Sequence, residues 1–424
     1  MRNAMHLWIL SCLGTAAALY AADSQAPAGM PIPVASPASV GLSTERLERF
    51  SQRIKQDVAD GEMPGAVVAI ARKGKLAYYD SFGFVDKAAG TAMPKDAIFA
   101  LASMTKPMVA VGTLMLAEEG KLLLNDPVGN YLPQLKDMKV AGPNGIVAAH
   151  RQPTLQDMLR HTAGVSYGNR GDTPLHKLYE ARIRSAADQS GVEFLEELSN
   201  LPLYYQPGTQ WEYSHGLDVA GLAIEAVTKK RLGEFLQERL WTPLGMTDTA
   251  FVQPQTKAAR IARPLPHDPD TGRAVNFRVP VTPWQYDCGG GCASGTALDY
   301  IRFAEMLRKN GTFNGTRILS RKTVEYMTSN QLGPEVDKSR LDEFPVEHMN
   351  GFGFGLGVAV RTQTGVAGVP GTLGEFMWSG AQGTMFWVDP KEELTVVFLA
   401  NTPGPVRRHY RELVKWLVEQ AVND

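Results

Sequence analysis

Ser103 and Lys106 stand three residues apart at the start of an apolar segment that ends near Gly120. The spacing predicts a buried helix, and residues i and i+3 share one helix face, so the hydroxyl and the amine would lie side by side. A serine hydroxyl becomes a good nucleophile when a base takes its proton, and a lysine serves as that base when burial lowers its pKa. Taken alone, the pair is also typical of a solvated helix start.

A second serine competes for the role of nucleophile. Ser166 lies in Gly164-Val-Ser-Tyr-Gly168, which matches the nucleophile-elbow pattern G-x-S-x-G. That elbow needs a strand before the serine and a helix after it. Here a helix is predicted before the serine, over 154–161, and a loop is predicted after it, over 168–172. The context therefore argues against Ser166.

Two later stretches carry further candidate groups. Tyr213 and His215 follow a turn at 206–208, and a tyrosine near a lysine can relay protons between a nucleophile and a leaving group. The segment 378–381 is rich in small residues, which let a substrate approach a strand edge whose N–H groups can bind an oxyanion. Alone, each stretch is better explained by ordinary packing.

Strands are predicted near both ends of the chain, with helices between them. After a helix over 43–61, the expected strands are 66–71, 76–84, 352–360, 374–378, 383–388 and 394–399, and a last helix runs over 406–421. The helices expected in the middle are 154–161, 217–230, 232–240 and 297–309.

This order predicts an α+β fold, in which one antiparallel sheet is built from the N- and C-terminal segments and a large helical region is inserted. Within one unit over 41–424, we expect an α/β part at about 41–100 and 347–424 and a helical part at about 101–346. A ligand site is expected in the cleft between them.

Composition excludes some classes of function. The 424 residues are 44% hydrophobic and 21% charged, which is ordinary for a globular protein with a sizeable core. Lys and Arg number 43 against 44 Asp and Glu, so the formal net charge is −1. This balance does not favour nucleic acid or an anionic membrane surface as a partner.

The N-terminus has the layout of a secretory signal peptide over residues 1–22, with a basic residue, an apolar run and small residues at its end. Residues 23–40 are expected to form a flexible leader. Ile9-Leu-Ser-Cys12 loosely resembles a lipoprotein cleavage box, but the apolar run before the cysteine is short. We therefore expect a periplasmic or secreted protein without stable membrane insertion after cleavage.

Two further cysteines, Cys288 and Cys292, bracket three glycines. In an oxidising compartment they can form a disulfide, and the glycines permit the tight loop. Two free thiols or a metal site are the alternatives. No histidine or second cysteine pair has zinc spacing nearby, so no metal is expected.

Taken in order, Ser103-Met-Thr-Lys106, Tyr213-Ser-His215 and Trp378-Ser-Gly380 resemble the three motifs of the serine β-lactamase and penicillin-binding-protein superfamily. The closest resemblance is to the class C β-lactamase-like family VIII carboxylesterases, and it spans nearly the whole chain after the leader. It implies a β-lactamase-like fold with Ser103 as the acylated nucleophile, Lys106 as its base and Tyr213 as proton relay. It also implies an oxyanion hole from the backbone N–H groups of Ser103 and Ala381, and substrate contacts from Trp378, Ser379, Gly380, His215 and Tyr167.

Two departures from the class C pattern bear on the substrate. The third motif there begins with a lysine that binds the β-lactam carboxylate, whereas here it begins with Trp378. The second motif there usually ends in asparagine, where this chain has His215. An apolar indole favours uncharged esters over anionic lactams.

We therefore predict a serine carboxylesterase that hydrolyses short-chain acyl esters through an acyl-Ser103 intermediate, with no cofactor and with weak cephalosporin hydrolysis as a side activity. Two alternatives stay open. A β-lactamase or D-peptidase would use the same three residues and would differ in the charge of its pocket. A penicillin-binding sensor would be acylated without turnover. In either enzyme, Lys106 or Tyr213 is the primary base.

Overall fold

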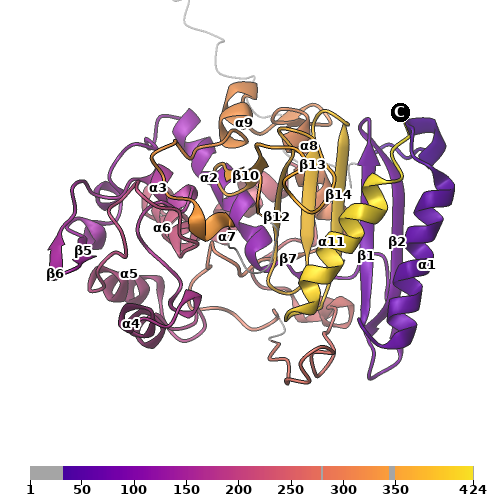
Figure 1. Cartoon of the computed structure of the whole chain (residues 1–424), viewed down its shortest axis with the longest axis horizontal. Coiled ribbons are helices and arrows are strands. Elements are labelled where there is room, and N and C mark those ends of the chain that lie inside the picture. Colours follow the sequence, from indigo (N-terminus) through magenta and orange to yellow (C-terminus); the bar gives the residue numbers. More distant parts are fainter. Residues whose placement is uncertain (1–31, 278–279, 343–348, 424) are drawn as a thin grey trace, which may run out of the picture.

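The computed structural model describes residues 32–277, 280–342 and 349–423. Its largest sheet has eight antiparallel strands in the order β10-β11-β12-β13-β14-β1-β2-β3, and it occupies the right-hand half of Figure 1. The strands are β1 Gly65–Arg72, β2 Lys75–Asp86, β3 Thr91–Ala92, β10 Phe352–Phe354, β11 Ala359–Arg361, β12 Phe376–Ser379, β13 Met385–Asp389 and β14 Leu394–Ala400.

The two ends of the chain meet at the middle of this sheet. Strand β1 pairs with β14, and Val67 lies opposite Leu399. Strand β14 in turn pairs with β13, and β13 with β12. The expectation of one antiparallel sheet built from both terminal segments is therefore confirmed.

Both faces of the sheet are buried, which explains why β1 is apolar from Gly65 to Ala71. Alternate side chains of a strand point to opposite faces. Val68 and Ile70 pack beneath the two terminal helices, α1 (Thr44–Asp60) and α11 (Val406–Glu419). Val67 and Ala69 join the larger core shared with the helical region. In Figure 1, α1 and α11 cross the front of the sheet beside each other.

The inserted region is mainly helical and lies to the left in Figure 1. Its helices are α2 Thr105–Glu118, α3 Leu155–Leu159, α4 Pro174–Arg182, α5 Gly191–Ser199, α6 Gly216–Thr228, α7 Leu232–Leu236 with a π-helical turn at Gln237–Trp241, α8 Ala297–Arg308, α9 Arg321–Met327 and α10 Ser339–Asp342. Three two-stranded sheets accompany them: β4 Phe99–Ala100 with β7 Ser294–Gly295, β5 Lys139–Gly142 with β6 Gly145–Ala148, and β8 Thr312–Phe313 with β9 Thr316–Arg317.

One helix from the range expected to be helical packs on the large sheet. Helix α8 belongs to the range 101–346, yet it packs against β1, β13 and β14. Its Tyr300 ring lies 5.0 Å from the ring of Phe386 on β13. Helix α8 thus covers the face of the sheet opposite α1 and α11, because its buried side chains form part of the larger core.

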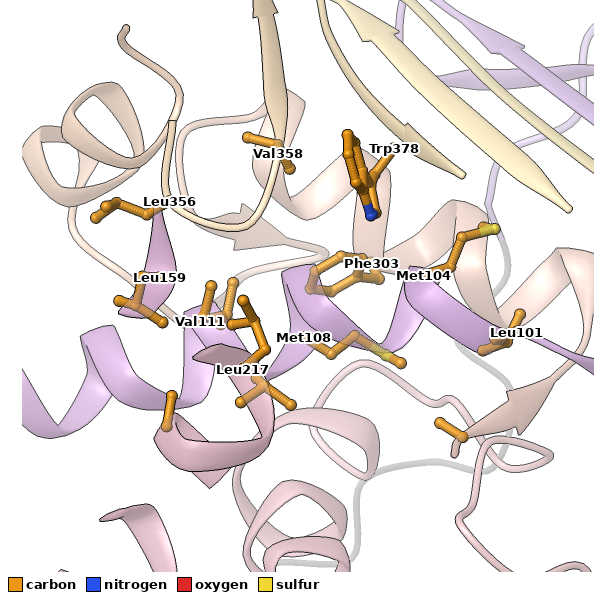
Figure 2. Close-up of a cluster of buried hydrophobic side chains, with 14 of the residues drawn as sticks. Leu101, Met104, Met108, Val111, Leu159, Leu217, Phe303, Leu356, Val358 and Trp378 are labelled. Carbon is orange, nitrogen blue, oxygen red and sulfur yellow. The ribbon is translucent and has the colours of Figure 1, made fainter. Parts of the chain in front are cut away.

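A single strand over 352–360 is also wrong. The segment forms β10 and β11, joined by a tight turn in which Gly357 has φ +76°. A Cβ on this glycine would lie 3.0 Å from the Cβ of Ala110 on α2. The turn therefore seats directly on α2, and Figure 2 shows Leu356 and Val358 above Leu159 and Val111.

The end of the expected leader is instead attached to the fold. Residues 37–40 form a 3-10 helix, Ile32 and Val40 are buried, and Val34 bridges Leu76 of β2. The expected signal peptide over 1–22 lies outside the described residues. Among the described helices, none has both the length and the apolar character needed to cross a bilayer.

Candidate active site

Ser103 lies in a 3-10 turn, Ala102–Met104, that leads directly into α2. Ala102 has φ +47°, a backbone conformation that residues with side chains rarely adopt. Lys106 follows in the first turn of α2, and its Nζ lies 3.1 Å from Ser103 Oγ. Its side chain is fully buried. The predicted pairing of hydroxyl and amine is therefore present.

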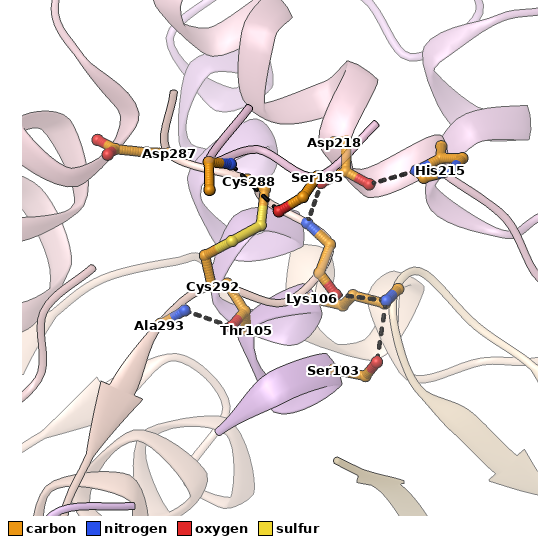
Figure 3. Close-up of a disulfide and its surroundings, with 12 residues drawn as sticks. Ser103, Thr105, Lys106, Ser185, His215, Asp218, Asp287, Cys288, Cys292 and Ala293 are labelled. Carbon is orange, nitrogen blue, oxygen red and sulfur yellow. Dashed lines mark hydrogen bonds and ion pairs between the residues drawn. A yellow bond between two sulfur atoms is a disulfide. The ribbon is translucent and has the colours of Figure 1, made fainter. Parts of the chain in front are cut away.

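Lys106 has a second partner that is distant in the sequence. Its Nζ donates to the carbonyl oxygen of Gly290 at 2.5 Å. Gly290 sits in a short loop closed by a disulfide between Cys288 and Cys292, whose Cα atoms are 5.3 Å apart. Figure 3 shows this bridge beside the lysine. Of the three states open for these cysteines, the structure has the disulfide.

Aromatic rings enclose the amine. The centre of the Tyr213 ring lies 4.6 Å from Lys106 Nζ, and that of Tyr167 lies 5.5 Å away. Both distances are in the range of cation–π contacts. Tyr213 also stacks on Trp211, with ring centres 6.2 Å apart and an interplanar angle of 18°. Burial raises the pKa of the Tyr167 hydroxyl well above its usual value, so Tyr167 is a neutral wall of the site.

The third motif reaches the site from the end of β12. The Trp378 ring lies 5.5 Å from that of Tyr213. A Cβ on Gly380 would lie 2.3 Å from the carbonyl oxygen of Leu101, too close for any side chain. Thr384 donates to the same oxygen at 3.2 Å. This close contact holds the turn after β12 against the backbone that leads to Ser103.

These segments border one cleft of about 360 Å³. It is lined by Ala102, Ser103, Tyr167, Asn169, Arg170, Tyr213, Gly291, Trp378, Ser379, Ala381, Arg407 and Arg411. The predicted nucleophile, the relay tyrosine, both residues of the expected oxyanion hole and three expected substrate contacts therefore share it. The remaining two, His215 and Gly380, do not line it. Lys106 lies beneath its floor, in contact with Ser103.

His215 is turned towards its own helix instead of the substrate. It occupies the N-cap position of α6, and its Nδ1 lies 3.1 Å from Asp218 Oδ2. Its ring packs on Tyr167 and Phe194, at centre distances of 4.2 and 5.5 Å. The imidazole lies behind Tyr167 and does not line the cleft, so the expected substrate contact at His215 stays a prediction.

Three arginines in the cleft were missed by the sequence analysis. Arg411 donates to the carbonyl oxygen of Gly380, and Arg407 donates to that of Ala381 at 3.3 Å. The guanidinium carbon of Arg170 lies 5.0 Å from the centre of the Tyr213 ring. No acidic side chain is among the described residues that line the cleft. Their sequence offered one signal: Arg407 and Arg411 are four residues apart on the last helix and therefore share one of its faces.

Residues 50–420 match the model of the Beta-lactamase family. The chain belongs to this family. Esterase EstB of Burkholderia gladioli is 30% identical over 403 residues, covering 86% of this chain and 94% of EstB. Lovastatin esterase of Penicillium rubens is 29% identical and covers 82% and 90% of the two chains.

Solved structures agree on the fold. The hydrolase EstCE1, described as having promiscuous acyltransferase activity, superposes with a TM-score of 0.73, at 24% identity and with 90% and 99% of the two chains covered. Unliganded simvastatin synthase (LovD) from Aspergillus terreus gives 0.73 at 24% identity, covering 89% and 99%. The fold is therefore β-lactamase-like, and the family and its esterase relatives support a hydrolase.

Within this β-lactamase-family fold, the competing serine is buried. Ser166 Oγ lies within hydrogen-bonding distance of Glu212 Oε1, at 2.9 Å, and of the carbonyl oxygen of Tyr167, at 3.0 Å. It has no exposed surface and does not line the cleft. Its hydroxyl therefore contacts buried groups of the protein and does not face the cleft. Among the described residues, no cluster of three or more side chains suited to a metal ion was found.

Proposed function

We propose that this protein is a serine carboxylesterase of the family VIII type, which hydrolyses esters with short acyl chains. The observation that carries the proposal is the 3.1 Å contact between Lys106 Nζ and Ser103 Oγ at the floor of a cleft. Tyr213 and the turn after β12 border the same cleft. The relatives named as esterases support this chemistry over other uses of the fold.

The proposed reaction proceeds through an acyl-serine. Lys106 accepts the hydroxyl proton as Ser103 Oγ bonds to the ester carbonyl carbon, and the backbone N–H groups of Ser103 and Ala381 stabilise the oxyanion. The C–O bond to the alcohol then breaks, and the leaving oxygen takes a proton through the hydroxyl of Tyr213. Water attacks the acyl-serine in the second half and regenerates Ser103.

The cleft supports a small substrate. At about 360 Å³ it is at the lower end of ligand pockets, and the rings of Tyr167, Tyr213 and Trp378 border the nucleophile. Such walls favour short apolar acyl groups. Long chains would have to extend into solvent, where they gain no stabilisation from burial.

Two serine variants test the proposal. Ser103→Ala is expected to abolish hydrolysis of p-nitrophenyl butyrate, whereas Ser166→Ala keeps most of it. Intact-mass spectra of the wild type, quenched early, are expected to show one acyl adduct that Ser103→Ala lacks. Full activity of Ser103→Ala would overturn the assignment, and loss of activity only in Ser166→Ala would transfer it to the other serine.

A second candidate function is favoured by the arginines of the cleft. Arg170, Arg407 and Arg411 surround the approach to Ser103, and guanidinium groups recognise carboxylates. β-Lactams and peptides with a free terminus carry such a group, so a β-lactamase or D-peptidase remains the alternative. Comparing kcat/KM for a cephalosporin and for p-nitrophenyl butyrate decides between them, because a large preference for the lactam would displace the esterase.

We also propose that the protein acts in the periplasm or outside the cell. The composition of residues 1–22 supports export. The disulfide is a second support, because disulfides persist in oxidising compartments. Fractionation of cells that express the full chain tests this, and activity confined to the cytoplasm would overturn it.

A further inference from the structure

Asp218 lies directly behind the reactive pair, although it touches neither Ser103 nor the cleft. It is the third residue of α6, five positions after Tyr213, and only 4% of it is exposed. Its Oδ1 accepts the backbone N–H of Gly290 at 2.8 Å, and its Oδ2 lies 3.1 Å from His215 Nδ1. In Figure 3 a dashed line joins the carboxylate to His215, and Lys106 lies below it.

Gly290 connects this carboxylate to the proposed base. Its N–H is held by Asp218, and its carbonyl oxygen accepts from Lys106 Nζ at 2.5 Å. A Cβ at this position would lie 2.5 Å from Asp218 Oδ2, so only glycine allows the approach. Asp218, Gly290, Lys106 and Ser103 therefore form one continuous chain of hydrogen bonds.

The orientation of the amine matters for the proposed chemistry. A neutral amine has two N–H donors and one lone pair, and it accepts the proton of Ser103 only when the lone pair faces Oγ. A lysine side chain has high rotamer freedom. An acceptor that holds one N–H of Lys106 fixes the direction of the lone pair. The carbonyl of Gly290 supplies that acceptor, provided that its own loop does not move.

We propose that Asp218 is a positioning residue, which fixes the Gly290 carbonyl so that the lone pair of Lys106 faces Ser103. His215 holds the second carboxylate oxygen and so orients Asp218 in turn. The disulfide is an independent restraint, because it closes the five-residue loop around Gly290. This inference rests on the proposed function, and it explains why a histidine that does not line the cleft ends the second motif.

A purely structural role is the competing explanation. An acidic residue in the first turn of a helix is stabilising, because it faces the positive end of the helix dipole. The chain supplies a matched case in Asp299, the third residue of α8. Asp299 is equally buried and accepts the N–H of Asp248 at 2.8 Å, in the same way that Asp218 accepts that of Gly290. Asp299 has no contact with Lys106.

The test compares Asp218→Ala, Asp218→Asn and Asp299→Asn, each checked for folding by circular dichroism and thermal melting. In Asp218→Ala, kcat for p-nitrophenyl butyrate is expected to fall at least about 10-fold, with KM changed less than about threefold. Asp218→Asn should recover to within about threefold of the wild type, since its amide oxygen still accepts the Gly290 N–H. Asp299→Asn should alter the melting temperature and leave kcat within about twofold.

Reduction of the disulfide supplies a second measurement on the same proteins. In the wild type, Asp218 still holds Gly290, so reduction with a phosphine is expected to lower kcat less than about threefold. In Asp218→Ala both restraints are then lost, and a further decrease of at least about fivefold is expected. Equal effects of reduction in the two proteins would contradict the shared action on Gly290.

Two results would overturn the role of Asp218. One is a folded Asp218→Ala enzyme with wild-type kcat, and the other is an Asp218→Asn enzyme as slow as the alanine variant. Failure of the proposed function gives a different pattern, because Ser103→Ala would then stay active whatever the Asp218 variants do.

Discussion

Lys106 Nζ lies 3.1 Å from Ser103 Oγ, although the side chain of Lys106 has no exposed surface. Burial of the side chain keeps this nitrogen out of bulk water. Instead of water, the amine contacts the carbonyl oxygen of Gly290 and the rings of Tyr213 and Tyr167. The site thus holds an amine next to a hydroxyl with no carboxylate in direct contact with it among the described residues.

The first prediction concerns the base. Replacing Lys106 with Met keeps most of the buried volume but removes the proton acceptor, so kcat is expected to fall at least about 1,000-fold. Lys106→Arg should not restore it, because a guanidinium does not lose its proton in proteins. Stopped-flow measurement of the acylation burst is the readout. Substantial activity of the arginine variant would exclude Lys106 as the base.

The second prediction concerns the turn after β12. Gly380→Ala places a methyl group 2.2 Å from Thr384 Oγ1 and 2.3 Å from the Leu101 carbonyl oxygen. The turn must move away from Ser103, so activity should fall at least about 100-fold, with a loss of about 1–3 kcal/mol in unfolding free energy. Gly90→Ala is the control, because a Cβ there meets nothing within 4 Å. It should cost only about 1 kcal/mol for its positive φ and leave activity intact.

The third prediction concerns the charge of the cleft. Arg407→Gln is expected to lower the ratio of kcat/KM for mono-p-nitrophenyl succinate to that for p-nitrophenyl butyrate by about 10-fold, because one substrate carries a carboxylate. Added salt should lower the same ratio in the wild type. Arg408→Gln is the matched control, since Arg408 pairs with Glu412 and does not line the cleft. An unchanged ratio in Arg407→Gln would contradict anion recognition by this arginine.

The fourth prediction concerns pH and stability. Burial raises the pKa of Asp299 from 3.8 to about 6. Below pH 3.8 both the folded and the unfolded state hold this proton, and between the two values only the folded state keeps it. The raised pKa therefore makes unfolding easier as the pH rises through 6, by up to about 3 kcal/mol. Asp299→Asn should lose this dependence.

The measurement is the difference in unfolding free energy between pH 4 and pH 7, from urea titrations of both proteins. The unfolding free energy of Asp299→Asn should rise relative to that of the wild type as the pH goes from 4 to 7. Asp248→Asn should show no comparable gain over this range: desolvation of Asp248 is outweighed by its Arg260 and Lys257 partners, which hold its pKa below the usual 3.8, so its own pH dependence lies below about pH 4. Parallel pH curves for Asp299→Asn and wild type would contradict the prediction.

Features set by neighbouring residues were predictable from the sequence. The contact of Ser103 with Lys106 follows from their i, i+3 spacing, and the strands follow from their apolar runs. The prediction of a single strand over 352–360 was wrong because it did not treat the glycines in this segment as a signal for a turn. Gly357 turns the chain so that it can lie against α2, and that partner is more than 200 residues away in the sequence.

Other features of the site also depend on contacts between residues that are far apart in the sequence. Asp218 and Gly290 are 72 residues apart, and nothing local to either residue signals their contact. His215 fits the expected substrate position by motif alone, whereas its orientation depends on Asp218. The arginines of α11 enter the cleft only because the C-terminal helix crosses the sheet beside β12 and β13. Such contacts follow from tertiary packing, which spacing does not reveal.

The pairing of β1 with β14 has a consequence for folding during synthesis. During translation, β1 leaves the ribosome more than 300 residues before its partner, so the centre of the sheet closes only when the chain is almost complete. Contacts of such long sequence separation slow folding. Until then the incomplete chain exposes the apolar edge of β1, and an exposed strand edge of this kind can pair with other chains and aggregate.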